Sequence, residues 1–362
     1  MEDRIYTAIG SSNIAFIKYW GRREDRINLP NNSSVSMTLD KNVGTKTSVL
    51  FSDKLERDKL FINGKEESIE EGANEKLRFI GEMLDYCKNA AGINTKALIV
   101  SENNFPSDSG LASSASGGAT LAFLLANAMD LKMHPKEISI MARKISGSAC
   151  RSVYGGIVKW NAGSKSDGSD SFAEQVVDHK HWPDLMDIIA IVDPSKKKVS
   201  SSSGHTITVR TSSLYKERPK FAEEGVKKVV EAVKDRDFQA LAEAVMRDSN
   251  NMHATMIDSW PPIMYLNDAS RNIIYAVHEL NESEGEYVAA YTFDAGPNAH
   301  IITTSSNRGK VIKMLEETGV VRSIIESKMG AGPEMLEGEE SLIDQESLAP
   351  RHNRNPEIGK ND

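Results

Sequence analysis

A glycine- and serine-rich segment, residues 106–118, has the composition of an anion-binding loop. Glycines let the backbone approach a ligand closely, and successive N–H groups in such loops form nests for anions. An apolar helix is expected to follow and to add its positive N-terminal end. Ser113, Ser114 and Ser116 add hydroxyl donors, so the segment is a candidate phosphate-binding loop, with an ordinary flexible loop as the alternative. The segment is not a Walker A loop, because GxxxxGK[ST] is absent.

Three charged residues stand where a charge needs a partner. Lys18 ends an apolar, strand-like run, where a charge is costly unless it meets an anion. Arg151 lies among serines and glycines, an arrangement that suits bidentate capture of a carboxylate or phosphate. Asp294 follows an apolar run directly and precedes a Gly-Pro turn. Each also has a plainer explanation: a lysine that reaches water, a surface arginine beside a turn and a turn-capping aspartate.

Predicted strands and helices must position these residues, and they follow one another along the chain without strict βαβα alternation. This order favours an α+β fold over a doubly wound parallel sheet. Apolar runs and period-two alternation predict strands, apolar residues at helical spacing predict helices, and Asn63-Gly64 is typical of a hairpin turn. Strands are expected at 6–9, 14–19, 35–39, 46–51, 59–62, 97–100, 186–192, 288–292 and 300–304. Helices are expected at 75–90, from the Gly/Ser segment to about 131, and at 135–144, 222–246 and 269–280.

The length of 362 residues suggests about two domains. A boundary near Trp182-Pro183 divides the chain into an N-terminal domain, residues 1–183, and a C-terminal domain, residues 184–340. Residues 341–362 are polar, and we expect this tail to be partly disordered.

The composition excludes several classes of protein. A net charge of −8 argues against general binding to nucleic acid or to an anionic membrane, since binding to phosphates needs a basic face. Two cysteines with no CxxC motif make a disulfide scaffold and a structural zinc site unexpected. No apolar run approaches the ~20 residues of a membrane span, and Met1–Arg4 lack the pattern of a signal peptide, so we expect a cytoplasmic location.

Further motifs accompany these segments in one order along nearly the whole chain, from about Ala8 to residues 340–344. They are Lys18-Tyr19-Trp20-Gly21, Asn32-Ser33-Ser34, Asn103-Asn104-Phe105-Pro106, Gly110 to Ala115, Ser146 to Ser152, His181-Trp182-Pro183, Asp248-Ser249-Asn250, His253-Ala254-Thr255, Pro261-Pro262, Tyr265-Leu266-Asn267 and Tyr291 to Asn298. Together they resemble the mevalonate diphosphate decarboxylases of the GHMP kinase superfamily. So many long motifs in one order make a chance resemblance negligible.

The resemblance implies an α+β GHMP kinase fold, with an N-terminal domain like ribosomal protein S5 domain 2 and a ferredoxin-like C-terminal domain. The active site is then expected between the two domains. The resemblance also implies a homodimer and a place in isoprenoid biosynthesis. Members of the family phosphorylate the C3 hydroxyl of mevalonate 5-diphosphate with MgATP, and loss of phosphate and carbon dioxide then gives isopentenyl diphosphate.

The resemblance also implies residue roles. Asp294 matches the essential aspartate, which orients or deprotonates the C3 hydroxyl. Lys18 matches a cation near the reacting groups, and Arg151 matches the arginine that holds the C1 carboxylate. The matching substrate-binding residues are Tyr19, Trp20, Arg22, Ser146 and Ser148; the nucleotide-phosphate residues are Gly110, Ser113 and Ser114; no metal ligand is assigned.

The sequence departs from the family pattern at three places. Residues 106–110 read Pro-Ser-Asp-Ser-Gly instead of the usual Pro-Thr-Ala-Ala-Gly. The carboxylate of Asp108 should repel ATP unless it faces solvent or Mg²⁺. Arg22 stands in place of the usual lysine, and His205 in place of the usual methionine.

These departures leave two substrates open. The complete loop and both serines favour ATP-dependent decarboxylation of mevalonate 5-diphosphate. The alternative is ATP-independent decarboxylation of mevalonate 3,5-bisphosphate to isopentenyl phosphate, which needs no cofactor. A mevalonate-type kinase is less favoured, because it has no need for Lys18 and Arg151, and a non-catalytic binding module of the same fold is the least favoured.

Overall fold

The computed structural model describes residues 4–70, 74–105, 113–193 and 199–351. One sheet combines strands of the N-terminal half with β16 from near the end of the chain, in the strand order β16-β1-β6-β9-β7-β8. In it, β7 and β9 are parallel and the other neighbours are antiparallel. The predicted hairpin is confirmed, since Asn63 and Gly64 connect β7 and β8 with positive φ angles. The strands are β1 (Ile5–Ser11), β6 (Gly44–Ser52), β7 (Lys59–Ile62), β8 (Lys65–Glu67), β9 (Lys96–Asn103) and β16 (Glu334–Leu336).

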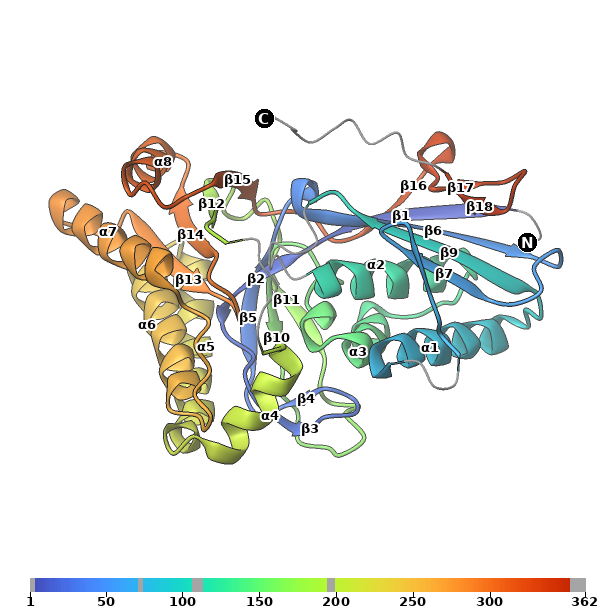
Figure 1. The fold of residues 1–362 in the computed structure, drawn as a ribbon, viewed down its shortest axis with the longest axis horizontal. Helices are drawn as coiled ribbons and strands as arrows, with labels where there is room; N and C mark the ends of the chain where they lie inside the picture. The colour runs from blue at the N-terminus through green and yellow to red at the C-terminus, as the bar shows by residue number, and fades with distance from the viewer. Residues whose placement is uncertain (1–3, 71–73, 106–112, 194–198, 352–362) are drawn as a thin grey trace.

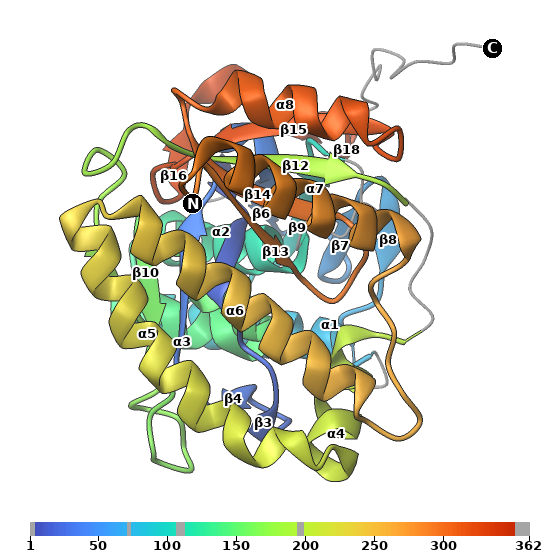
Figure 2. The same cartoon turned by 90° about the vertical axis from the view of Figure 1, so that its left-hand side faces the viewer.

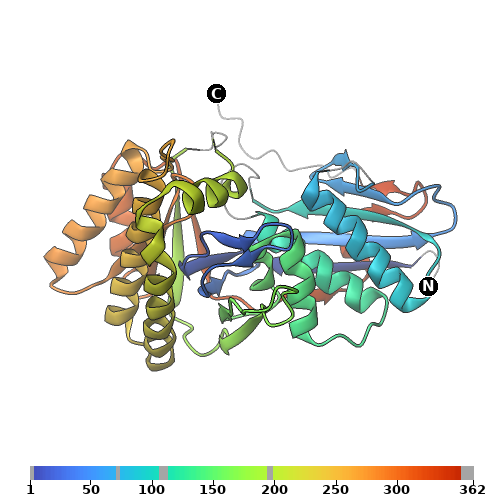
Figure 3. The ribbon, with the colours of Figure 1, turned by 90° about the horizontal axis from the view of Figure 1, so that it is seen from below.

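Helices α1 (Glu75–Ala91), α2 (Ser113–Ala128) and α3 (Pro135–Ile145) cover one face of this sheet (Figures 1 and 3). Helix α1 begins where the Asn74 side chain accepts a hydrogen bond from the Leu77 N–H, and it ends at Gly92 in the left-handed conformation. Helix α2 is apolar on most of its surface, and it is accordingly the most buried of the three.

A central antiparallel sheet has the strand order β11-β10-β5-β2 and lies between the N-terminal sheet and the C-terminal helices (Figure 1). Every residue of β2 and β5 is buried. The sequence alternation at 35–39 predicts a half-buried strand, and the structure corrects this, because protein covers both faces of β5. The strands are β2 (Asn13–Ile17), β5 (Ser34–Thr38), β10 (Ile157–Trp160) and β11 (Ala173–Val177).

The C-terminal half contains an antiparallel sheet with the order β13-β14-β12-β15 and several helices, some of which pack against this sheet and others against the central sheet or against one another (Figure 2). The strands are β12 (Leu185–Ile191), β13 (Ala289–Phe293), β14 (Ala299–Thr304) and β15 (Ser323–Lys328). The helices are α4 (Ser201–Thr211), α5 (Arg218–Asp235), α6 (Phe238–Ile257), α7 (Asp268–Glu284) and α8 (Arg308–Glu317).

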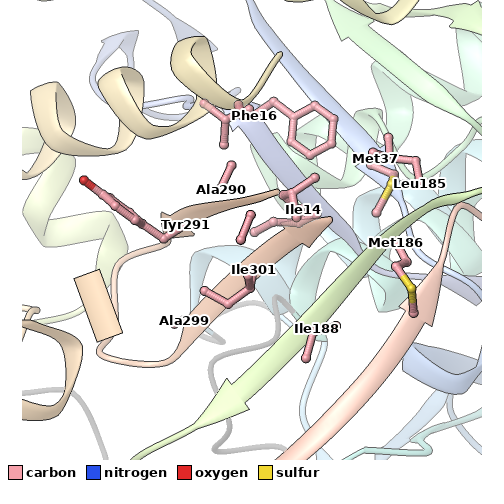
Figure 4. Close-up of a cluster of buried hydrophobic side chains, with 14 of the residues drawn as sticks. Ile14, Phe16, Met37, Leu185, Met186, Ile188, Ala290, Tyr291, Ala299 and Ile301 are labelled. Atoms are coloured by element: carbon pink, nitrogen blue, oxygen red, sulfur yellow. The ribbon is translucent and has the colours of Figure 1, made fainter. Parts of the chain in front are cut away.

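One hydrophobic cluster joins the central sheet to the C-terminal half (Figure 4). Phe16 of β2 and Met37 of β5 belong to the same cluster as Ile188 of β12 and Ile301 of β14. The core therefore continues past the predicted boundary near 182–183, where Trp182 is itself buried. The domain limits stay a prediction.

The helix predicted at 222–246 is wrong as a single element. The structure has two helices, α5 and α6, separated by Arg236, whose φ of 55° lies in the left-handed region. Asp237 then caps α6 by accepting a hydrogen bond from the Ala240 N–H. Both helices are amphipathic, so the apolar spacing runs across the break without marking it.

Part of the predicted tail is folded. The short strands β17 (Ile343–Asp344) and β18 (Ala349–Pro350) pair with each other, and Leu342 and Ile343 are buried in a cluster that includes Leu50 of β6. Two apolar residues in a polar stretch are enough to attach it to the sheet. Residues 352–362 lie outside the described residues.

The remaining elements are short connections. They are β3 (Arg22–Glu24), β4 (Leu29–Pro30), and the 3-10 turns η1 (Lys41–Val43), η2 (Gly147–Cys150), η3 (Leu214–Glu217) and η4 (Gly338–Glu340). Within the described part of the chain, no helix combines the length and the hydropathy that a membrane crossing requires.

Candidate active site

Two strand ends from different halves of the chain bring Lys18 and Asp294 together. Lys18 follows β2 and Asp294 follows β13, and Lys18 Nζ lies 2.7 Å from Asp294 Oδ1. The register of β2 against β5 shifts between Ala15 and Ile17, a bulge that redirects the strand just before Lys18. Lys18 is 2% exposed and Asp294 is 32% exposed. The carboxylate is therefore the member of this pair that a ligand can reach.

A buried ion pair behind Lys18 holds its backbone. The Lys18 N–H donates to Asp248 Oδ2 at 2.7 Å. Arg218 donates to both oxygens of Asp248, at 2.6 and 3.0 Å, and also to the Lys18 carbonyl oxygen at 3.2 Å. Asn32 donates to the same carbonyl oxygen at 3.0 Å. The backbone of Lys18 is therefore bonded on both sides, which fixes the direction of its side chain toward Asp294.

Replacing Asp248 by Asn should destabilise the protein strongly. Both Asp248 and Arg218 are fully buried, so the variant leaves an arginine charge inside the protein without its carboxylate. Removing one partner of such a pair costs about 3–5 kcal/mol in free energy of unfolding. Urea unfolding followed by circular dichroism measures this loss.

The matched control is Glu243→Gln on the same helix. Its ion pair with Arg247 is exposed and is expected to contribute little. If Asp248→Asn were no less stable than Glu243→Gln, the buried ion pair would contribute no more to stability than the exposed one.

Arg151 follows η2, is 3% exposed and packs against strand β5 of the central sheet. Its Nε donates to Asn13 Oδ1 at 3.2 Å and to Ser36 Oγ at 3.0 Å, and its Nη1 donates to Ser34 Oγ at 2.7 Å. Ser34 and Ser36 are two apart on β5, so both hydroxyls share one face of the strand. Among the described residues, no group accepts from Nη2. The outer edge of the guanidinium therefore keeps N–H groups for a ligand.

The electrostatic environment of Arg151 includes the carboxylate of the Lys18 pair. Burial lowers the pKa of Arg151, and the negative charge of Asp294 opposes this shift. The neighbouring Cys150 is buried, which raises the pKa of its thiol to about 12, so this thiol stays neutral. Lys18 thus contacts the accessible carboxylate directly, and Arg151 is a second cationic group that this carboxylate influences electrostatically.

The predicted serines gather at the start of helix α2. Ser146 Oγ lies 3.2 Å from Ser114 Oγ and 3.2 Å from Ser148 Oγ. Asn13, which contacts Arg151, also donates to the Ser148 carbonyl oxygen at 3.2 Å. A row of hydroxyls therefore runs from the positive N-terminal end of α2 toward Arg151. Such a row suits a ligand with several anionic oxygens.

Ser113 is the first residue of α2, beside this row. Its own carbonyl oxygen accepts a hydrogen bond from Ser116 Oγ at 3.2 Å. Gly110 and Asp108, the other predicted residues of the loop, lie outside the described residues.

The residues predicted for the phosphate end of the substrate form a turn after Lys18. Arg22 Nε donates to the Tyr19 hydroxyl oxygen at 2.7 Å. Burial raises the pKa of Tyr19 to about 12, so this hydroxyl keeps its proton and can donate it to an anion. Trp20 is 2% exposed, and its buried indole N–H has no protein partner among the described residues.

Several residues of this site have no role that the sequence pattern indicates. Arg218 belongs to none of the motifs. Asp248 belongs to the motif Asp248-Ser249-Asn250, for which the sequence indicates no function. A buried acid in the middle of an amphipathic helix, with a matching arginine elsewhere, was the available signal for both. Ser34 and Ser36 gave the opposite signal, because alternating serines on a strand indicate a solvent-facing side.

Both halves of the chain match family models of known proteins. The family model for the diphosphomevalonate decarboxylase-like N-terminal domain matches residues 10–173, and that for the mevalonate 5-diphosphate decarboxylase C-terminal domain matches residues 187–319. The diphosphomevalonate decarboxylase of Debaryomyces hansenii is 44% identical over 326 residues, which cover 86% of this chain and 83% of that relative. The chain belongs to the diphosphomevalonate decarboxylase family.

Solved structures of this family share the fold. Mevalonate diphosphate decarboxylase from Trypanosoma brucei has a TM-score of 0.86 at 34% identity and covers 94% of this chain and 100% of its own. The complex of MDDEF with MVAPP, AMPPCP and magnesium has a TM-score of 0.80 at 33% identity and covers 92% of this chain and 99% of its own. The α+β GHMP kinase fold expected from the sequence is confirmed.

Proposed function

We propose that this diphosphomevalonate decarboxylase family member converts mevalonate 5-diphosphate and ATP into isopentenyl diphosphate, ADP, phosphate and carbon dioxide. The observation that carries this proposal is the pairing of Lys18 with Asp294 beside Arg151. It combines an accessible carboxylate with one cation in contact and a second within electrostatic range, which suits a substrate that must lose both a proton and a carboxylate. As a decarboxylase of this family, the chain is a carboxy-lyase.

Asp294 takes the first role in this mechanism. Its carboxylate orients the C3 hydroxyl of the substrate and accepts its proton as the phosphoryl group is transferred. Lys18, fixed by Asp248 and Asn32, holds the carboxylate in one orientation. Pre-positioned charges of this kind act without reorganisation during the reaction.

Arg151 takes the second role. Its outer N–H groups hold the C1 carboxylate, while Ser34, Ser36 and Asn13 hold its other edge. As phosphate leaves C3, the electron pair of the C1–C2 bond forms the C2–C3 double bond, and C1 departs as carbon dioxide. Arg151 aligns the bond that breaks.

The remaining residues bind the two phosphorylated groups. Tyr19, Trp20 and Arg22 take the diphosphate end, and Ser146 and Ser148 hold the middle of the substrate. Ser113 and Ser114 at the start of α2 fit the nucleotide phosphates, because the first turn of α2 has no acidic residue and carries the positive end of the helix. Mg²⁺ is expected to enter with ATP and to neutralise charge on its phosphates.

Metal ligands are not assigned. Across the described ranges, no group of three or more His, Cys, Asp or Glu residues is placed to hold a metal ion by itself.

Carbon dioxide release separates the two candidate substrates. One reaction contains mevalonate 5-diphosphate with MgATP, and the other contains mevalonate 3,5-bisphosphate without nucleotide. We expect release only in the first, with one ATP consumed per carbon dioxide. Release only in the second reaction would overturn the proposal in favour of the ATP-independent alternative.

Asp108 is the residue of the loop that favours the ATP-independent alternative. A like charge about 4 Å from a phosphate costs on the order of 1 kcal/mol even at the dielectric constant of water. If Asp108 faces the nucleotide, Asp108→Ala should tighten ATP binding. If it faces solvent or supports Mg²⁺, the variant should bind ATP no better than the native protein.

We further propose that the enzyme is a homodimer in the cytoplasm, with a phosphorylated mevalonate rather than nucleic acid or a membrane as its ligand. Exposed apolar residues support the dimer, since Leu214, Ile257, Trp260 and Met264 are each at least half exposed near the C-terminal end of α6. Sedimentation equilibrium, which reports the mass of the assembly, tests the dimer.

A further inference from the structure

The turn of residues 18–22 is held from the other half of the chain by helix α4 and the segment that follows it. The Gly21 N–H donates to Nδ1 of His205 at 2.7 Å. The Tyr215 hydroxyl donates to the Trp20 carbonyl oxygen at 2.9 Å. Gly21 has a φ of +91°, and a Cβ there would lie 1.7 Å from the Tyr215 hydroxyl oxygen, so the turn requires glycine. The backbone of the turn, with glycine at position 21, therefore fits closely against the side chains of His205 and Tyr215.

His205 also contacts the side chains of the turn. Its ring stacks on Trp20, with ring centres 4.3 Å apart and planes inclined by 27°. The ring centre lies 4.5 Å from that of Tyr19. His205 is 4% exposed, so it is part of the interior in which both aromatic side chains are packed. One residue thus contacts the backbone and two side chains of the predicted substrate-binding turn.

Helix α4 makes a second polar contact with the same turn. Arg22 Nη1 donates to Ser202 Oγ at 3.1 Å, three residues before His205 on the helix. Arg22 is the residue that also orients the Tyr19 hydroxyl. The first turns of α4 therefore bind both ends of the Tyr19–Arg22 segment.

The contact with Gly21 defines the state of the imidazole. Since the Gly21 N–H is a donor, Nδ1 must accept, and the ring hydrogen is on Nε2. Burial and the nearby charge of Arg22 lower the pKa of His205 well below 6.5. The ring is therefore neutral at physiological pH, and its Nδ1 accepts the hydrogen bond from the Gly21 N–H of the turn.

We propose that His205 is a positioning residue for substrate binding: it fixes the turn of residues 18–22 so that Tyr19 and Arg22 face the phosphate end of the substrate. The nature of that ligand rests on the proposed function. The effect of His205 on the turn does not depend on it, and the two can be tested separately.

Two amide substitutions distinguish an acceptor at the δ position from mere packing. His205→Asn places its Oδ1 near the native Nδ1, so it can still accept from the Gly21 N–H. His205→Gln carries its amide one atom further out, so it fills more of the ring volume but loses this acceptor. A positioning role predicts that Asn preserves function and Gln does not, whereas a packing role predicts that the larger Gln is at least as good.

Steady-state kinetics with mevalonate 5-diphosphate and saturating MgATP give the first measurement. We expect His205→Gln to raise KM for mevalonate 5-diphosphate about tenfold, the scale of one hydrogen bond, with a smaller change in kcat. His205→Asn should stay close to the native KM. Equal effects of the two variants, in either direction, would overturn the proposal.

Hydrogen–deuterium exchange of the ligand-free protein gives the second measurement. We expect faster exchange in peptides covering residues 17–24 for His205→Gln, and native exchange for His205→Asn. Arg210→Gln is the control, since Arg210 is exposed on the same helix, and it should change neither measurement. If the native protein failed to turn over mevalonate 5-diphosphate, the proposed function would fail, and exchange alone would still decide the role of His205.

A third variant covers the case in which His205→Gln does not fold. Tyr215→Phe keeps the buried ring and removes the hydroxyl that donates to the Trp20 carbonyl oxygen. With His205 intact, exchange in residues 17–24 should stay close to native. Full exchange of this segment despite an intact His205 would show that Tyr215 and not His205 holds the turn, and would overturn the proposal.

Discussion

Asp294→Asn should lower turnover by at least ~10²-fold while the protein stays folded, which is the scale of removing a positioned acid or base. The amide keeps the size of the side chain and can still accept a hydrogen bond from Lys18, so the contact between the two strand ends survives. It cannot accept the proton of the C3 hydroxyl. Carbon dioxide release under saturating substrates measures the effect on kcat, and thermal unfolding checks the fold.

The matched control for this variant is Asp235→Asn. Asp235 is an exposed aspartate at the end of α5, so its substitution removes the same charge away from the site. It should leave turnover unchanged. A near-native rate in Asp294→Asn with an unchanged melting temperature would remove Asp294 from the mechanism.

Arg151→Lys should be nearly as damaging, although the charge is kept. The arginine uses Nε and Nη1 to bind Asn13, Ser34 and Ser36, and we propose that its remaining N–H groups hold the C1 carboxylate. A lysine has one ammonium group, which cannot hold the strand and two carboxylate oxygens at once. Misalignment on the scale of 1 Å costs about 10²-fold in rate.

The position of Arg151 predicts which step suffers. In the proposed mechanism, phosphoryl transfer to C3 depends on Asp294, whereas loss of carbon dioxide depends on the alignment of the C1 carboxylate. Rapid quenching of a single turnover should therefore reveal a C3-phosphorylated intermediate that builds up in Arg151→Lys. Arg247→Lys, an exposed substitution on α6, is the control. Native product formation without accumulation would mean that Arg151 is not the carboxylate-binding group.

The candidate reactive residues were visible in the sequence because each depends on local pattern. Lys18 and Asp294 both follow apolar runs, and a charge at the end of a buried strand needs a partner. The strands before them, β2 and β13, were predicted from five or six residues of hydrophobicity. The Gly-Pro turn after Asp294 likewise predicted that the chain returns as β14. Such features need only the residues next to them in the chain.

The partners of these residues depend on packing between distant segments. Lys18 and Asp294 are 276 positions apart, and Lys18 and Asp248 are 230 apart, so no local pattern relates them. The polar face of β5 illustrates the same limit. Its serines indicate solvent when only the strand is considered, yet they are buried, because Arg151 packs against that face and donates hydrogen bonds to both hydroxyls.

The sequence by itself determined the fold class and the family and named the candidate charged residues. Hydrophobic spacing is a property of neighbouring residues, and the order of the motifs can be followed along the chain without any knowledge of the packing. Only the tertiary structure decided which of the charged residues meet. It divided one apolar helical pattern into α5 and α6 at Arg236, attached residues 341–351 to the sheet, and placed α4 against the turn of residues 18–22. Each of these outcomes depends on volume, backbone direction and unpaired polar groups supplied by segments far along the chain. Those quantities exist only when the segments are packed together.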